Sequence, residues 1–207
     1  MKLKMLNPRA LLTLQDGTEV EVERIGRGRY STAWRNCQNV YLQTNEKDYG
    51  KELISRVAEE KNPHIPACVQ LDWQDGNAPY RWYRMPLYQP LTAKSVRAWE
   101  DFKALKQARE DAQRSLPYDQ KRTDDADVHE VNAKFVELVE DATYLSETLK
   151  EAVRLLVEEC QNYGAYTIEI SKRNCAVDAE GNLILLDPVF DLAEVRSQWR
   201  KQRAARY

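Results

Sequence analysis

The sequence is poor in glycine, histidine and cysteine, and each shortage limits what the chain can be. It has 207 residues, of which seven are glycine, two histidine and four cysteine. The cysteines are too far apart for the paired spacing of a structural zinc site. In a reducing compartment we expect them to be free thiols and not disulfides. They are Cys37, Cys68, Cys160 and Cys175.

Long apolar runs and a strong charge of one sign are also absent. No apolar run approaches the roughly 18 residues of a membrane span, and the N-terminal stretch MKLKMLNPRALLTLQDG lacks the apolar segment of a signal peptide. The net charge is −2, which excludes a general attraction of the whole protein to nucleic acid. Because 43% of the residues are apolar, a packed core is expected. We expect a cytoplasmic protein that does not associate with membranes.

Alternating apolar residues and turn signals indicate a β-rich first part. Within residues 18–90 they predict an antiparallel sheet of five strands and one helix at 46–60. A further strand at 10–14 precedes this sheet and joins it through the turn Gln15-Asp16-Gly17. The five strands are predicted at 18–25, 32–35, 39–44, 67–74 and 80–86.

The second part changes to a helical pattern. Apolar residues recur every three or four positions from Val128 to Ala142 and from Leu145 to Tyr163, and a third helix is predicted at 93–113. Strands are predicted at 166–170, 174–178 and 183–186, and the last sixteen residues are predicted to form a basic helix. The patterns therefore predict an α+β protein with two domains, residues 1–90 and 91–207.

Two glycines stand close together between two predicted strands. In Ile25-Gly26-Arg27-Gly28-Arg29-Tyr30-Ser31, glycine lets the backbone pass close to a phosphate group. A simple hairpin turn has the same appearance, so both interpretations stay open here.

A predicted hairpin near the C-terminus carries an amide and a carboxylate. Asn174 and Asp187 are thirteen residues apart, and Glu169 lies five residues before Asn174. Oxygen ligands of this kind suit Mg²⁺. A plain surface hairpin with an Asp-Pro turn would show the same residues.

Taken in order, these segments resemble the protein-kinase-like family. GRGRYSTAW (26–34) is similar to its glycine-rich loop, NPHIP (62–66) to the loop after its first helix, EISKRN (169–174) to its catalytic loop, and Asp187-Pro188-Val189 to its metal-binding triplet. The resemblance covers about residues 18–191 and is greatest to the early protein kinases of lytic short-tailed phages. It implies a two-lobed fold whose C-terminal lobe is reduced and mainly helical.

The resemblance also implies roles for particular residues. ATP and Mg²⁺ would bind between the lobes, with Asn174 and Asp187 at the metal and Glu169 at the acceptor hydroxyl. The glycine loop would cover the phosphates; its residues are Gly26, Arg27, Gly28, Arg29 and Ser31.

The sequence departs from the family at several positions. Leu42 or Gln43 stands where the family has its strand lysine, and Glu169 replaces the catalytic aspartate. Only about 18 residues follow Val189, too few for an activation segment and a helical substrate platform. Arg27 or Arg29 could replace the lysine, or could be solvent-exposed charges at a hairpin tip. Glu52, the candidate helix glutamate, has no evident partner.

These departures leave three functions open. The first is a pseudokinase that binds a host protein during phage takeover of the cell, with impaired or absent phosphotransfer. The second is an active, atypical, ATP-dependent serine/threonine kinase acting on host proteins. The third is a helical interaction module with a vestigial cleft. A basic tail could bind an acidic partner or phosphates, or could simply solubilise a helix end. Its cations are Arg196, Arg200, Lys201, Arg203 and Arg206.

Overall fold

The computed structural model describes residues 1–6, 9–28, 31–45, 49–71, 80–115, 125–163 and 166–191. Within these residues the protein is α+β, as predicted. The chain divides into two units: Met1–Lys61 with Pro66–Tyr88, and Asn62–Ile65 with Gln89–Tyr207. None of the helices in this described part is long and apolar enough to cross a membrane.

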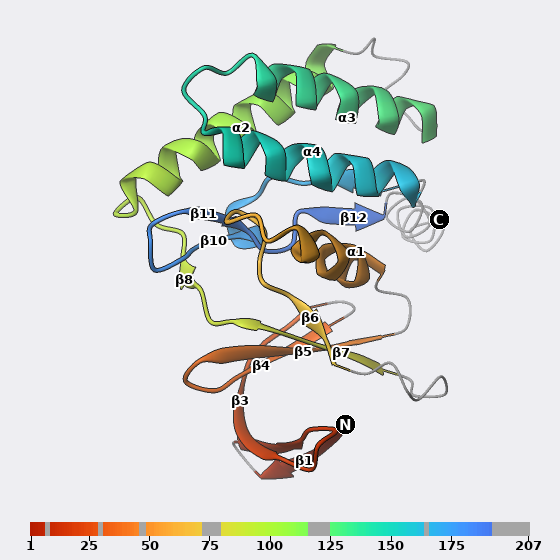
Figure 1. Cartoon of the computed structure of the whole chain (residues 1–207), viewed down its shortest axis with the longest axis vertical. Helices are drawn as coiled ribbons and strands as arrows, with labels where there is room; N and C mark the ends of the chain where they lie inside the picture. Colours follow the sequence, from red (N-terminus) through yellow and green to blue (C-terminus); the bar gives the residue numbers. More distant parts are fainter. Residues whose placement is uncertain are drawn as a thin grey trace, which may run out of the picture. The chain divides into compact units, whose positions relative to one another are not determined.

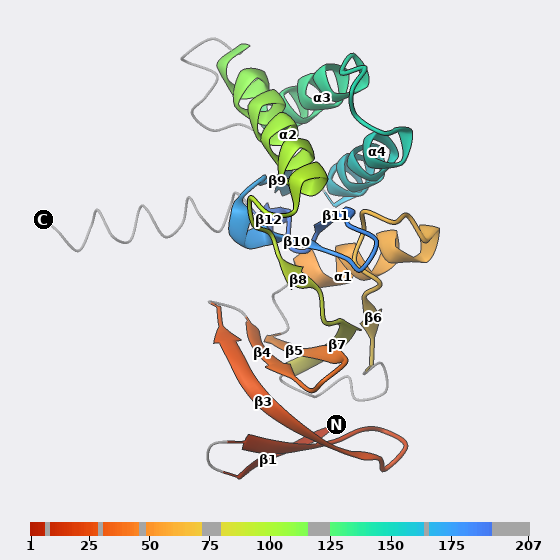
Figure 2. The same cartoon turned by 90° about the vertical axis from the view of Figure 1, so that its left-hand side faces the viewer.

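The first unit contains one antiparallel sheet of seven strands, so the expected number of five was wrong (Figure 2). The strand order is β1-β2-β3-β4-β5-β7-β6. The strands are β1 (Lys2–Leu6), β2 (Arg9–Thr13), β3 (Glu19–Arg27), β4 (Ser31–Arg35), β5 (Asn39–Asn45), β6 (Val69–Gln70) and β7 (Tyr80–Pro86).

β1 and β2 pair at the N-terminal edge and continue the sheet; β2 corresponds to the strand predicted at 10–14, whereas β1 was not predicted. In β1, Leu3 stands opposite Leu12 of β2, and β2 in turn pairs with β3 through Leu12 and Val20. Leu12 is fully buried and packs into a cluster with Val22 and Trp34. The turn that joins β2 to β3 is the predicted one: Gly17 has a φ of 84°, which a residue with a side chain rarely adopts. Burial of one face of the β1–β2 hairpin explains why it joins the sheet.

The helix of the first unit matches its apolar pattern. α1 covers Tyr49–Val57 and continues as one 3₁₀ turn, η1 (Ala58–Glu60). Leu53 and Ile54 are fully buried. The helix ends at Lys61, whose φ of 55° turns the chain out of the helical path before the Asn-Pro sequence.

Three helices make up most of the second unit, and α3 packs against both of the others (Figure 1). They are α2 (Val96–Ser115), α3 (Asp125–Glu140) and α4 (Glu147–Asn162), close to the predicted ranges. Ser146 caps α4, its hydroxyl oxygen accepting from the N–H of Leu149 at 3.3 Å. The buried face of α4 includes Leu149, Val153, Leu156 and Cys160, as the period of three or four predicted.

Short strands complete the second unit in two small sheets, ordered β11-β10-β8 and β12-β9. The predicted strands at 166–170, 174–178 and 183–186 are present in shorter form. β8 and β12 were not predicted, because strands of two or three residues carry no alternation to detect. The strands are β8 (Gln89–Pro90), β9 (Tyr166–Ile168), β10 (Cys175–Val177), β11 (Leu183–Leu185) and β12 (Val189–Asp191).

The segment 62–65 belongs to the second unit because of His64. Its ring Nδ1 lies 2.8 Å from the carbonyl oxygen of Leu183, and its Nε2 lies 3.2 Å from the hydroxyl of Thr148. Its own carbonyl oxygen accepts from the N–H of Leu185 at 2.9 Å. With 1% of its surface exposed, His64 joins this loop to β11 and to the start of α4.

Candidate functional site

The backbone holds Glu169 beside Asp187. β9 pairs with β12, with Ile168 opposite Val189. Directly after β9, the N–H of Glu169 donates to the carbonyl oxygen of Pro188 at 2.6 Å. Since Pro188 follows Asp187, this bond sets the two acidic residues on neighbouring stretches of chain.

Asn174 is tied to the same place from the other side. It ends the 3₁₀ turn η3 (Lys172–Asn174), and its N–H donates to the carbonyl oxygen of Ser171 at 3.0 Å. The carbonyl oxygen of Asn174 accepts from the N–H of Leu186 at 2.9 Å and from that of Asp187 at 3.3 Å. Glu169, Asn174 and Asp187, which come from three consecutive segments of the chain, therefore meet in one loop cluster of the second unit.

The side chains of this cluster also interact. One carboxylate oxygen of Glu169 accepts from the amide Nδ2 of Asn174 at 3.4 Å, and the other accepts from the guanidinium of Arg173, also at 3.4 Å. The Glu169 side chain is 36% exposed and that of Arg173 is 79% exposed. Both contacts are long, so the carboxylate lies at the surface and is weakly held.

The residues present suit a magnesium ion only in part. The amide nitrogen of Asn174 faces Glu169, so its Oδ1 is the atom left as a ligand, and the exposed carboxylate of Asp187 is the second oxygen donor. Across the described residues, no three His, Cys, Asp or Glu side chains gather closely enough to bind a metal together. A hydrated ion held by one carboxylate and one amide fits this donor set, since Mg²⁺ commonly keeps several water ligands.

The glycine segment forms a hairpin in the first unit. Gly26 and Arg27 end β3, Ser31 begins β4, and the N–H of Gly28 donates to the carbonyl oxygen of Ser31 at 2.7 Å. A Cβ at Gly28 would lie 3.3 Å from the Ser31 hydroxyl oxygen, whereas one at Gly26 would meet no atom within 4 Å. Arg27 is exposed, and Arg29 lies outside the described residues. The described part of this segment therefore shows two paired strand ends with the exposed cation Arg27 on one of them.

Glu52 has a partner that the sequence did not reveal. On α1, its Oε1 accepts from Arg56 at 2.8 Å, and its Oε2 accepts from Nη1 of Arg81 on β7. The side chain of Glu52 is 11% exposed, against 30% for Arg81. Glu52 therefore has two arginine partners where the sequence showed none.

Arg81 stands next to the position where a strand lysine was expected. β5 and β7 are neighbours in the sheet, with Thr44 opposite Arg81 and Gln43 opposite Trp82. Tyr83, two residues further along β7, is fully buried, and burial raises its pKa to about 12 against the opposing effect of Arg81. Sequence inspection missed Arg81 because the cation comes from a strand 37 residues away from Thr44 in the chain.

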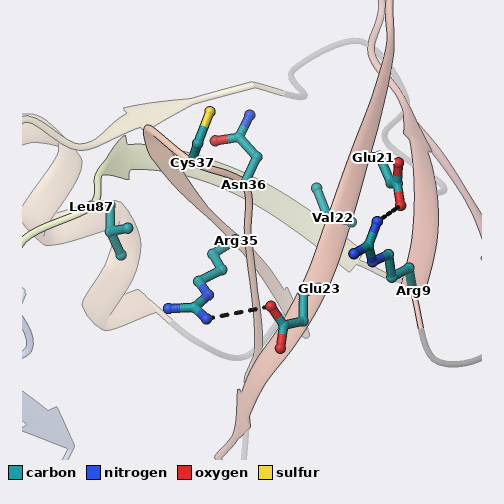
Figure 3. A pocket seen from close by; sticks show the side chains of 8 residues that line it. All are labelled: Arg9, Glu21, Val22, Glu23, Arg35, Asn36, Cys37 and Leu87. Carbon is teal, nitrogen blue, oxygen red and sulfur yellow. Dashed lines mark hydrogen bonds and ion pairs between the residues drawn. The ribbon is translucent and has the colours of Figure 1, made fainter.

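A pocket of about 500 Å³ lies elsewhere in the first unit (Figure 3). Two ion pairs line it: Arg9 and Glu21 pair at 2.6 Å, and Arg35 and Glu23 pair at 3.3 Å. Both guanidinium groups are thus neutralised by exposed carboxylates. The remaining lining residues are Val22, Asn36, Cys37 and Leu87, and none of the predicted site residues lines this pocket.

Comparison with known proteins adds no family: no protein-family model and no curated protein matches the chain. The assignment of the candidate site therefore rests on the positions and contacts of its own residues. The basic tail lies outside the described residues; its cations are Arg196, Arg200, Lys201, Arg203 and Arg206.

Proposed function

We propose that this chain is a protein-kinase-like protein that binds ATP with Mg²⁺ and transfers phosphate slowly to a hydroxyl of a host protein. The observation that carries the proposal is the meeting of Glu169, Asn174 and Asp187 in one backbone-bonded cluster. The similarity to early phage kinases supports a role in redirecting host transcription or countering host defence.

Each residue of the cluster has a distinct task. Asn174 and Asp187 supply the oxygen atoms that hold the metal, which when bound neutralises charge on the phosphate oxygens. Glu169 accepts a hydrogen bond from the acceptor hydroxyl and takes its proton. Its side chain is longer than that of aspartate by one methylene, and the 3.4 Å contacts from Arg173 and Asn174 hold the carboxylate only weakly. We expect slow transfer because misplacement by about an ångström can cost about a hundredfold in rate.

The ion pair in the first unit supports the same proposal. The loss of the strand lysine was the main objection to phosphate binding, because it removes a cation. Arg81 supplies a cation beside that position, and the nearly buried Glu52 fixes its orientation. An arginine also matches phosphate oxygens with a planar fork of donors.

A pseudokinase that acts only by binding a host protein is the second candidate. It is favoured by the contacts of Glu169, since both carboxylate oxygens already accept hydrogen bonds from residues of the same loop. A base occupied in this way is less able to take a proton from an acceptor.

Nucleotide binding is tested by calorimetric titration of ATP in the presence of Mg²⁺. We expect Asp187→Asn to weaken binding at least about tenfold, because mutation of groups that merely support metal ligands already has an effect of that size. Asp141→Asn is the matched control, as Asp141 is exposed in the turn after α3. Equal affinity in wild type and Asp187→Asn, or no binding by wild type at millimolar ATP, would contradict the proposal; the latter result would favour the helical interaction module.

Phosphotransfer separates the two candidates. With radiolabelled ATP and host lysate, we expect Glu169→Gln to reduce the rate by about a hundredfold or more, the usual contribution of a general base, with little change in ATP affinity. The control is Glu158→Gln on the exposed side of α4. ATP binding without transfer by wild type would establish the pseudokinase.

A further inference from the structure

A buried arginine of α2 reaches the strand that leads into the candidate site. Arg109 is 7% exposed. Its Nε donates to the carbonyl oxygen of Ile168 at 2.8 Å, and its Nη2 donates to the hydroxyl of Thr167 at 2.6 Å. Both acceptors belong to β9, and Ile168 directly precedes Glu169.

The contacts of Arg109 continue into α3. The hydroxyl of Thr167 donates to Oδ1 of Asn132 at 3.1 Å, and Nδ2 of Asn132 donates to the carbonyl oxygen of Tyr166 at 3.3 Å. The guanidinium carbon of Arg109 also lies 5.8 Å from the ring centre of Phe135. A buried polar network thus connects both helices to all three residues of β9.

This network carries a charge that has no counterion among the described residues. No carboxylate in the described part of the chain pairs with Arg109, and its Nη1 is buried without a hydrogen-bond partner there. Burial lowers its pKa to about 10, while the neighbouring Cys160 has its pKa raised by burial to about 12 and stays a neutral thiol at pH 7. A buried charge of this kind is unfavourable for stability, and an apolar side chain of similar volume often serves a core as well or better.

Its position gives Arg109 a role that an apolar residue cannot take. The peptide group between Ile168 and Glu169 is held on both sides: its carbonyl oxygen accepts from Arg109, and its N–H donates to the carbonyl oxygen of Pro188. Fixing this peptide plane fixes the backbone from which the Glu169 side chain departs, and also the chain next to Asp187.

We propose that Arg109 is the positioning residue of the candidate site, and that it orients the Ile168–Glu169 peptide so that the Glu169 carboxylate faces Asn174 and Asp187. The assignment of catalysis to Glu169 depends on the proposed function. The orientation of the peptide does not depend on it.

The first test measures hydrogen exchange of single amides by NMR in the full chain. Arg109→Met should lower the protection of the Glu169 amide about tenfold more than that of the Leu156 amide, which lies in the buried part of α4 and reports overall unfolding. Arg114→Met, an exposed arginine of the same helix, should leave both amides unchanged. Equal loss of protection at Glu169 and Leu156 would mean that Arg109 only stabilises the fold, and would overturn the proposal.

Further variants keep the test decisive. If Arg109→Met does not fold, Arg109→Lys replaces it: a single ammonium cannot reproduce the fork to Ile168 and Thr167, so the Glu169 amide should again lose more protection than Leu156. In the transfer assay, the same variants should lower kcat while ATP affinity changes less than about threefold. Absence of transfer in wild type would count against the proposed function alone, because the exchange comparison still decides the role of Arg109.

Discussion

Each unit of the protein contains a buried polar contact with an arginine, but the two contacts differ in how charge is balanced. In the first unit the carboxylate of Glu52 lies between Arg56 and Arg81. In the second unit Arg109 is bonded only to a carbonyl and a hydroxyl of β9 among the described residues. The first contact is an ion pair, whereas the second is a cation held by one backbone carbonyl and one side-chain hydroxyl, both uncharged.

Because of this difference, we expect the two contacts to contribute differently to the stability of the protein. Removing one partner of a buried ion pair leaves the other charge uncompensated, which costs about 3–5 kcal/mol in fully buried cases. Replacing a buried ionic group that has no counterion removes an unfavourable charge together with its hydrogen bonds, and the net change in stability is small. We therefore associate Arg81 with the stability of the first unit, and Arg109 with the geometry of β9.

The same substitution at both positions gives the largest expected effect. Arg81→Met should lower the free energy of unfolding by about 2 kcal/mol, less than for a fully buried pair because Arg56 still contacts Glu52. Arg109→Met should change it by less than about 1 kcal/mol in either direction, since the loss of a buried charge offsets a carbonyl left without a donor. Urea unfolding at pH 7 followed by circular dichroism measures both.

Exposed arginines on the same elements serve as controls. Arg84→Met on β7 and Arg114→Met on α2 should each shift stability by no more than about 0.5 kcal/mol. A cost for Arg109→Met equal to that for Arg81→Met would remove the distinction between the two contacts.

The helices and most strands could be predicted from the sequence because the spacing of their apolar residues shows which face of each element is buried. The face of α4 and the strand Tyr80–Pro86 follow directly from the spacing of apolar residues. β1 was missed although lysine and apolar residues alternate in it as in a strand, since the segment has five residues and its contribution to the core becomes evident only when Leu3 is paired with Leu12 of the next strand.

The candidate site could be predicted where it depends on order along the chain and not where it depends on pairing across it. Glu169, Asn174 and Asp187 were chosen together because their segments follow the order of a known family. Arg81 and Arg109 were missed, since each acts on a residue far away in sequence: Arg81 on Glu52, and Arg109 on β9. Nothing in the local sequence of a strand or helix indicates which distant carboxylate or carbonyl an arginine will reach.

A third buried group in this chain, His64, extends the comparison to a side chain that can lose its charge. Burial lowers the pKa of His64 below the usual 6.5, although the bond to the Leu183 carbonyl and the charge of Asp101 act in the opposite direction. Arg109 stays charged when buried, whereas His64 is held neutral. Burial of His64 therefore lowers the stability of the folded protein only when the pH falls far enough to protonate the unfolded chain.

The smallest expected effect is a loss of stability below neutral pH that depends on His64. The unfolded chain takes up a proton near pH 6.5, and the folded protein does so only at lower pH, so protonation favours unfolding. The contribution of His64 is complete above pH 6.5 and is lost as the pH falls through its lower folded pKa. Asp101, whose pKa is raised by burial, acts in the opposite sense, because a carboxyl protonated more readily in the folded state adds stability as the pH falls. Urea midpoints measured between pH 7.5 and 5 should decline in wild type and in a His129→Gln control, and should decline less in His64→Asn. An equal decline in all three proteins would show that other groups set the pH dependence and that the neutral state of His64 contributes nothing to it.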